Sequence, residues 1–194
     1  MGGGPVFWFD FNSPYVYLAI HRVDDLLPDA EWRPFAYPFL LGRRGRLEEA
    51  ARRDPAAAFA AVAPRAEALG LPPLNPPDGL PQSTWSLPPL RAAVFADERG
   101  LLKEFTRAAF AKVFVEARTL TDLDNVLAAA GEAGLDPAEV AEAIERPDLK
   151  QRVKDNTDAA FERGVNGIPT FEVAGELVWG DDRLEEAAEL LRRR

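Results

Sequence analysis

Hydrophobic and polar positions follow two different rhythms along the chain. Residues 5–10 form a short aromatic and apolar run bounded by glycines and a polar turn, which predicts a buried strand. A helical face begins near Tyr17 and continues to about Leu27, and Pro28 ends it. Residues 31–37 alternate and predict a second strand with an edge-like proline.

The middle of the chain has the apolar spacing of helices. This spacing predicts five helical segments, at residues 47–69, 90–118, 121–130, 136–144 and 148–163. Residues 70–89 hold seven prolines and little periodicity, so we expect an extended connector there. Gly164 is placed to end the last of these helices.

A pattern of apolar residues typical of strands occurs again near the end of the chain. Residues 170–173 and 176–179 predict a tight hairpin around Gly175. A final helix is expected to start at Asp181 or Asp182. The order is therefore β-α-β, a long helical block, then α-β-β-α.

This order of elements favours an α/β protein with a thioredoxin-like sheet and a large all-helical insertion. We predict a thioredoxin-like domain made of residues 5–42 and 150–194. Residues 43–149 are predicted to form the helical insertion domain.

Composition narrows the classes of function. The chain has 194 residues, of which 47% are hydrophobic, so it can bury a sizeable core. The net charge of −9 argues against a nucleic-acid partner, because a phosphate backbone requires a basic face. The chain lacks cysteine and has a single histidine, so disulfides, CxxC redox chemistry and a metal site are not expected. We see neither a membrane-spanning run nor a secretory signal, and expect a cytoplasmic protein without membrane contact.

Two distant segments carry the candidate chemistry. In Asp10-Phe-Asn-Ser-Pro-Tyr15, the strand, turn and helix place Ser13 at a helix N-terminus, where unpaired N–H groups stabilise an anion. Gly167-Ile-Pro-Thr-Phe171 precedes the predicted hairpin. Together the segments look like the halves of a thioredoxin-type active site with serine in place of cysteine, which indicates a site for a thiolate from another molecule. Alternatively, Ser13 is simply an N-cap.

Both ends of the chain resemble one pair of enzyme families. Residues 10–19 resemble the N-terminal motif of the kappa-class glutathione transferases and the bacterial 2-hydroxychromene-2-carboxylate isomerases. Residues 164–171 and 179–184 resemble the C-terminal motifs of the same families, with a weaker similarity over 107–122. These families belong to the DsbA-like branch of the thioredoxin superfamily, so the resemblance implies a DsbA-like fold with a helical insertion.

The resemblance implies that glutathione is the cofactor and that Ser13 binds its sulfur. A hydroxyl donor beside a helix N-terminus lowers the pKa of a thiol from about 8.5 toward neutrality. The resemblance also implies that Pro169 is cis, and that Ile168 pairs its backbone with the cysteine part of glutathione as an added strand would. The alternative is an ordinary trans proline before a strand.

The resemblance implies that Asp182 and Arg183 hold the γ-glutamyl end of glutathione. Asp182 would bind the free ammonium of glutathione, and Arg183 would bind the carboxylate at the same end. Alternatively, Asp182 caps a helix and Arg183 is a surface residue. Asp181 stands where relatives usually carry a neutral polar residue, and its negative charge is expected to weaken the binding of an anionic ligand.

One part of the family pattern cannot be placed. Relatives commonly carry an Asn and a Lys that hold the glycine carboxylate of glutathione. This chain offers arginines instead, at Arg43, Arg44, Arg46, Arg52 and Arg53. Either one of the first three takes the carboxylate, or the arginines form a solvated basic helix start.

Four further residues are weaker candidates. His21 is expected to be structural, and Tyr15 is a candidate for a substrate pocket. Tyr17 is expected to lie in the core. Trp85 is assigned either to an aromatic wall over the site or to a packing role.

The resemblance therefore predicts a glutathione-dependent isomerase that acts on a small aromatic, chromene-type carboxylate, with a kappa-class-like glutathione transferase as the alternative. A different class, a non-catalytic DsbA-like binding protein that has lost the chemistry, stays open because the Asn and Lys are missing. Thiol–disulfide exchange is excluded by the lack of cysteine. Relatives are often dimers, and the apolar helical block offers surface for a homodimer.

Overall fold

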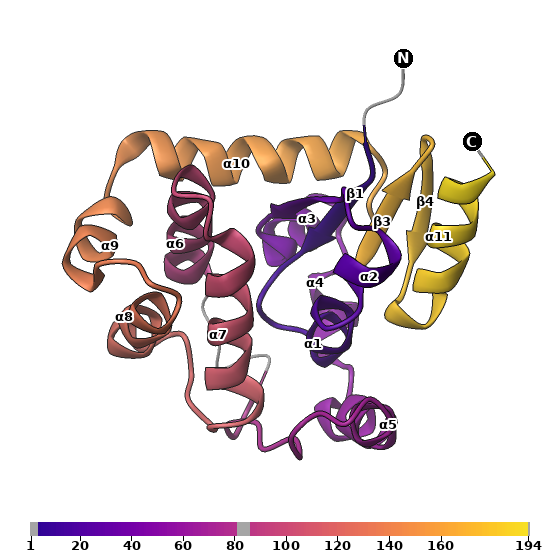
Figure 1. Ribbon diagram of the computed structural model, residues 1–194, viewed down its shortest axis with the longest axis horizontal. Coiled ribbons are helices and arrows are strands. Elements are labelled where there is room, and N and C mark those ends of the chain that lie inside the picture. Colours follow the sequence, from indigo (N-terminus) through magenta and orange to yellow (C-terminus); the bar gives the residue numbers. More distant parts are fainter. Residues whose placement is uncertain (1–3, 81–85, 194) are drawn as a thin grey trace.

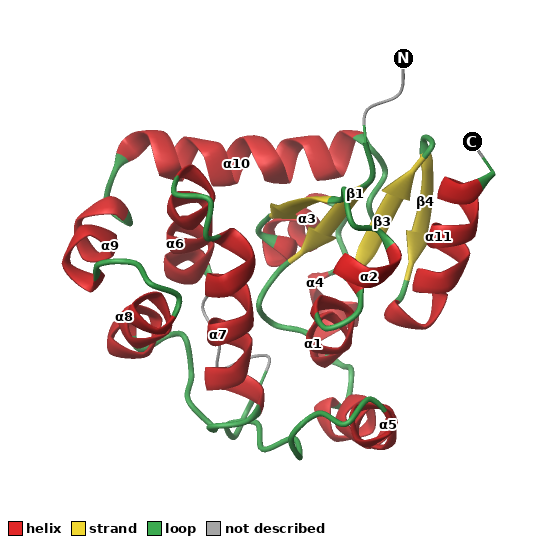
Figure 2. Cartoon of the chain, in the orientation of Figure 1, coloured by secondary structure: helices red, strands yellow, loops and turns green. Residues whose placement is uncertain are grey.

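The structure is a computed structural model that describes residues 4–80 and 86–193. Within these residues a small sheet is surrounded by many helices, as Figure 2 shows. In the described part, every helix is too short or too polar to cross a membrane. Trp85 lies outside the described residues.

The two ends of the chain build one four-stranded sheet with the order β2-β1-β3-β4. Strand β1 (Val6–Phe9) pairs in parallel with β2 (Glu31–Pro34) and antiparallel with β3 (Thr170–Val173). Strand β3 pairs antiparallel with β4 (Glu176–Trp179) across the predicted hairpin. The pairing of β1 with β3 brings Ser13 and Ile168, which follow and precede these strands, to the same end of the sheet.

The helices fall into three groups along the chain. The first group follows β1 and β2: α1 (Pro14–Ile20), α2 (Val23–Leu26), α3 (Tyr37–Arg43), α4 (Leu47–Ala51) and α5 (Pro55–Ala68). The second group is α6 (Leu87–Glu98), α7 (Leu102–Phe114), α8 (Leu123–Glu132), α9 (Pro137–Ala143) and α10 (Pro147–Glu162). The last comprises the 3-10 helix η1 (Asp181–Arg183) and α11 (Leu184–Arg192).

Helix α10 joins the helical group to the sheet. In Figure 1 it runs from the side of α6 and α9 to the side of α3 and the strands. Thr157 of α10 accepts a hydrogen bond from the Ala36 N–H at 3.0 Å, and Asn156 donates to the Pro34 carbonyl at 2.9 Å. These bonds satisfy backbone groups just beyond β2, so α10 fixes the point at which the chain enters α3.

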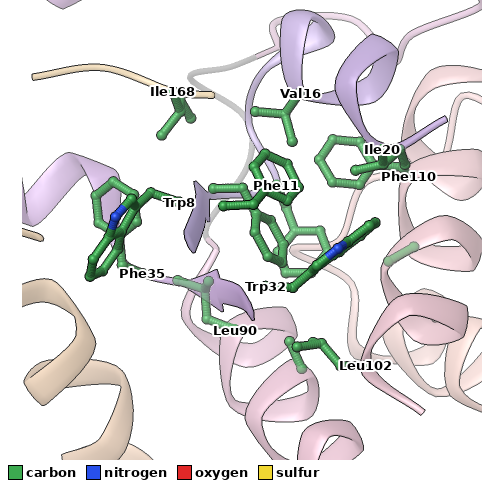
Figure 3. Close-up of a cluster of buried hydrophobic side chains, with 14 of the residues drawn as sticks. Trp8, Phe11, Val16, Ile20, Trp32, Phe35, Leu90, Leu102, Phe110 and Ile168 are labelled. Carbon is green, nitrogen blue, oxygen red and sulfur yellow. The ribbon is translucent and has the colours of Figure 1, made fainter. Parts of the chain in front are cut away.

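The core forms around β1, whose side chains alternate between the two faces of the sheet. Phe7 and Phe9 pack edge-on against Trp32, and Trp8 packs edge-on against Phe35. Figure 3 shows Trp8 with Phe35 on one side of the strand and Phe11 with Trp32 on the other. Because both faces are covered, all four residues of β1 are buried.

The fold class and the strand order along the chain are confirmed, and the predicted helical segments are present with different boundaries. The segment after β1 breaks at His21 into α1 and α2. The predicted helix 47–69 breaks before Pro55, and 90–118 breaks at Gly100, whose φ is +72°. Strand β2 ends at Pro34, and Tyr37 starts α3 instead of extending the strand.

Candidate active site

A cavity of about 970 Å³ opens where the ends of β1 and β3 meet the helices α3–α5. Its volume lies at the upper end of the range of small-molecule sites. We call the side formed by the chain next to the strands the sheet wall: Asn12, Ser13, Pro14, Tyr15, Ile168, Trp179, Gly180, Asp181 and Asp182. We call the opposite side the helical wall: Tyr37, Pro38, Leu41, Leu47, Ala50, Ala51, Arg53, Asp54, Pro55, Ala57, Ala58 and Phe59.

Ser13 lies on the sheet wall at the start of α1. It occupies the N-cap position with extended backbone (φ −129°, ψ 124°), and its carbonyl accepts from Val16 and Tyr17. Its side chain makes no capping hydrogen bond, and among the described residues no group bonds its hydroxyl. The residue is 8% exposed. The N-cap alternative therefore accounts for the backbone of Ser13 and leaves its hydroxyl free for a ligand.

Ile168 lines the same cavity as Ser13, and Pro169 follows it in the chain. The Ile168–Pro169 peptide is cis, as the sequence predicts, and the Pro169 carbonyl accepts from the Gly180 N–H at 3.0 Å. The backbone N–H and C=O of Ile168 make no hydrogen bond to any other described residue. An unpaired N–H and C=O beside a cavity can receive an extended peptide as an added strand would.

Trp179 closes the rim next to this loop. Its side chain is 48% exposed, and its indole packs directly on Gly167. A Cβ at Gly167 would overlap the indole, so the position requires glycine. The result is a large aromatic face beside the cis peptide, exposed to the cavity.

Asp181 is a structural residue in this chain. It is 1% exposed, and both of its carboxylate oxygens accept from Arg65 of α5, with Nη1 to Oδ1 at 3.0 Å. Arg22 also donates to the Asp181 carbonyl at 3.1 Å. Burial raises the pKa of Asp181, and the charge and hydrogen bonds of Arg65 oppose that shift. The sequence predicts that the negative charge of Asp181 acts on a nearby ligand. In the structure this charge is held instead in an ion pair with Arg65, which joins the sheet wall to α5.

Asp182 and Arg183 are placed differently from each other. Asp182 is exposed and lines the cavity, with its carboxylate folded over Gly180 (φ +109°). Arg183 is exposed, bonds Glu186 in the first turn of α11 at 2.6 and 2.7 Å, and does not line the cavity. An exposed pair of this kind is worth little, so Arg183 can exchange Glu186 for another carboxylate at low cost.

Of the five arginines at positions 43–53, Arg53 is the one that lines the cavity. Arg43 pairs with Asp158, Arg44 stacks on Phe161, and Arg46 donates to the Asn166 carbonyl. The first three are thus engaged with α10 and the loop after it, and Arg53 is the member of this group that borders the cavity. Sequence reasoning missed this because the break before Pro55, which turns Arg53 toward the cavity, was read as continuous helix.

Two further functional candidates escaped the sequence analysis. Asp10 is completely buried at the end of β1, where its carboxylate accepts from the Phe11 N–H, the Tyr37 N–H and the Ser86 hydroxyl at 2.6, 2.9 and 3.2 Å. Burial raises the pKa of Asp10 to about 7, against the lowering effect of these three bonds. Asp10 therefore links the loop that carries Ser13 to Tyr37, the second candidate.

Burial separates the three weaker candidates that lie within the described residues. Tyr15 lines the cavity, whereas Tyr17 is 2% exposed and packs at a tilt against Phe114 in the core, as predicted. His21 ends α1, packs edge-on against Tyr17 and does not line the cavity. Burial and the charge of Arg107 lower its pKa, so His21 favours the neutral form.

Known proteins resemble this chain in sequence and in fold. The chain is 27% identical to 2-hydroxychromene-2-carboxylate isomerase of Sphingobium xenophagum, over 92% of this chain and 93% of that protein. It is 30% identical to human glutathione S-transferase kappa 1, but that match covers 51% of this chain and 47% of the human protein. A solved structure of a 2-hydroxychromene-2-carboxylate isomerase superposes with a TM-score of 0.78 at 20% identity, over 98% of this chain and 95% of that one.

The structural match shows a shared fold, and the sequence matches agree with the resemblance of both chain ends. The family model of the DSBA-like thioredoxin domain matches residues 6–192, nearly the whole chain. The protein therefore belongs to the DSBA-like thioredoxin domain family.

Proposed function

We propose that the protein is a glutathione-dependent isomerase of a small aromatic, chromene-type carboxylate. The observation that carries the proposal is the Ser13 hydroxyl, which has no hydrogen-bond partner among the described residues and lines the same cavity as Ile168 with its unpaired backbone. The isomerase that matches most of the chain supports the reaction class.

In the proposed complex glutathione lies along the sheet wall. Ile168 pairs with the backbone of its cysteine, and the sulfur lies at the Ser13 hydroxyl. Asp182 binds the free ammonium, and Arg183 leaves Glu186 to bind the γ-glutamyl carboxylate. Helix α1 has only seven residues, so the hydroxyl donor contributes more than the helix dipole to holding the thiolate.

The helical wall provides the second half of the site. Four alanines, Leu41, Leu47 and Phe59 give it a largely apolar surface that suits a flat ring. The chromene ring first opens: the ring carbon–oxygen bond of the hemiketal breaks, the hydroxyl proton passes to the phenolic oxygen, and a ketone conjugated with the carbon–carbon double bond forms. The thiolate then adds to that double bond, the former double bond rotates, and elimination returns the thiolate. Glutathione is regenerated, and no proton or electron is consumed. A substrate with a leaving group would instead be conjugated, which is the transferase alternative.

A thermal-shift experiment tests the binding half of the proposal. Glutathione at roughly a hundredfold excess over Kd should stabilise the protein by about 2.7 kcal/mol. The shift should shrink strongly in Ser13→Ala and Arg183→Ala. Arg99→Ala is the matched control, since Arg99 is as exposed as Arg183 and also pairs with a glutamate, away from the cavity. A wild-type protein that melts at the same temperature with and without millimolar glutathione contradicts the proposal.

Turnover tests the chemistry. 2-Hydroxychromene-2-carboxylate should isomerise with wild-type protein only when glutathione is present, and Ser13→Ala should lower kcat by about 10- to 100-fold, the effect of losing one hydrogen bond to a charged group. Full turnover without glutathione would overturn the mechanism. Binding of glutathione without turnover of either chromene or chloro-nitroaromatic substrates would favour the non-catalytic alternative.

A further inference from the structure

Tyr37 is held in a fixed position relative to Ser13. Its backbone N–H donates to the Oδ2 of Asp10 at 2.9 Å, and Asp10 lies three residues before Ser13 on the loop that leaves β1. The edge of its ring packs against Phe35 with the centroids 6.2 Å apart. Tyr37 and Ser13 line the same cavity from opposite walls. The buried Asp10 carboxylate thus ties the helical wall to the sheet wall at this point.

The Tyr37 hydroxyl is backed by a cation. Burial raises the pKa of Tyr37, the positive charges of Arg53 and Arg46 lower it, the negative charge of Glu49 raises it, and the net shift is upward. Tyr37 therefore keeps its proton at neutral pH. Arg53 is itself held by Glu49 at 3.1 Å, and Glu49 also accepts from Arg46 at 2.9 Å.

The hydrogen-bonding capacity of this pair is incomplete. A phenol can donate one hydrogen bond, and the O–H of Tyr37 remains to be used. Within residues 4–80 and 86–193 no group accepts that proton. The phenol is thus a donor at the cavity, and the adjacent guanidinium makes it a stronger one.

We propose that Tyr37, backed by Arg53, binds the carbonyl oxygen of the electrophilic substrate and stabilises the negative charge that forms there. This inference rests on the proposed function. When the thiolate adds, a carbon–sulfur bond forms and the π electron pair of the double bond moves through the conjugated system to the carbonyl oxygen. The Tyr37 hydrogen bond shortens without transfer of its proton. Elimination returns the electron pair, breaks the carbon–sulfur bond and releases the thiolate.

The pair makes the site selective for conjugated carbonyl compounds. A displacement at a saturated carbon places no charge on a substrate oxygen, so Tyr37 gives it no advantage. The reactions of glutathione with 4-phenyl-3-buten-2-one and with benzyl chloride separate these cases. The first is an addition to a conjugated ketone. In the second the carbon–chlorine bond breaks and chloride leaves.

The experiment compares Tyr37→Phe and Arg53→Met with wild type on both probes. Tyr37→Phe should lower kcat with the ketone on the order of 100-fold, the usual cost of removing one oxyanion donor. Arg53→Met should lower kcat with the ketone about tenfold, since Arg53 acts on the substrate only through the Tyr37 phenol. Both variants should react with benzyl chloride at nearly the wild-type rate and keep the glutathione thermal shift. Arg52→Met is the matched control, because Arg52 is exposed, pairs with Glu48 and does not line the cavity.

Three outcomes would overturn the inference alone. Equal losses on both probes would mean that Tyr37 shapes the site without acting on the carbonyl. Loss of the glutathione shift in Tyr37→Phe would assign the pair to glutathione itself. A variant that retains full ketone turnover, while Ser13→Ala still loses it, would reject the inference and leave the proposed function intact. In contrast, a wild-type protein that neither binds glutathione nor reacts with either probe would reject the proposed function and this inference with it.

Discussion

The sheet wall of the cavity rests on some of the most tightly packed residues of the protein. Phe7, Trp8, Phe9 and Phe11 beneath Ser13 are completely shielded from solvent, and Phe11 contacts three other rings. The helical wall is attached far more thinly. Helix α4 has no buried residue, and of the fourteen residues of α5 only Val62 and Ala66 are buried.

This difference divides the site by task. A hydrogen bond to a sulfur must be positioned within a fraction of an ångström, and a densely packed core supplies that rigidity. Recognition of a flat apolar ring tolerates small movements, so a helical wall whose α4 and α5 bury few residues in the core is sufficient. Two polar links join the walls: Asp10 with Tyr37, and Asp181 with Arg65.

The largest expected effect comes from breaking the packing beneath the sheet wall. Phe11→Ala should lower the free energy of unfolding by about 3–5 kcal/mol, since it leaves a cavity among fixed rings. Phe59→Ala, on the half-buried face of α5, should cost only about 1–2 kcal/mol. Urea unfolding of both variants measures the contrast. Equal losses would show that the two walls are equally integrated in the core.

The Asp10 link should appear as a pH dependence of stability. The pKa of Asp10 is about 7 in the folded protein against 3.8 for the ordinary side chain. Between these values the folded state binds more protons than the unfolded state, so the contribution of Asp10 to stability falls as pH rises. Relative to Asp10→Asn, the free energy of unfolding of the wild-type protein should fall by about 2–4 kcal/mol between pH 4.5 and 7.5. A difference that is flat with pH, measured by urea titrations across this range, would contradict the assigned pKa.

The Asp181–Arg65 link is expected to matter less. Arg65→Met leaves the Asp181 carboxylate, which is 1% exposed, without its partner. Because Arg65 itself is partly solvated, we expect the free energy of unfolding to fall by only about 1–3 kcal/mol. Amide hydrogen exchange should become faster in α5 and stay unchanged in β1. Arg99→Met, which breaks an exposed pair, is the control. Faster exchange in β1 would show that the link supports the whole fold and not one wall.

The smallest effect on stability is expected at Leu47, which is 50% exposed on the helical wall. Leu47→Ala should change the free energy of unfolding by no more than about 0.5 kcal/mol. It should nevertheless raise KM for an aromatic substrate several-fold and leave kcat unchanged, because it removes uniform binding surface. A change in kcat with constant KM would place Leu47 in contact with the reacting atoms.

Local signals were sufficient for much of the sheet wall. The aromatic run before Asp10 predicts β1, Pro14 marks the first turn of α1, and the Gly167–Phe171 motif predicts the cis proline that the structure contains. The helical wall was harder, although part of its signal was in the sequence. Asp54 caps α5 and Pro55 occupies its first turn, a start signal inside a segment that was assigned to one helix.

Short-range rules of periodicity, capping and turn chemistry were enough to predict the strands and the helical segments, but not the helix breaks before Pro55 and at Gly100. The order of the elements favoured the thioredoxin-like sheet, and the turn before the first helix indicated Ser13. The candidacy of Ile168 came from the resemblance to known families. Three features arise only when the chain folds: Asp181 pairs with Arg65, Arg53 and not its neighbours reaches the cavity, and Tyr37 lines the same cavity as Ser13. The physical reason is that charge pairing and burial depend on which residues meet in space, and Arg65 and Asp181 are separated by 116 positions in the chain.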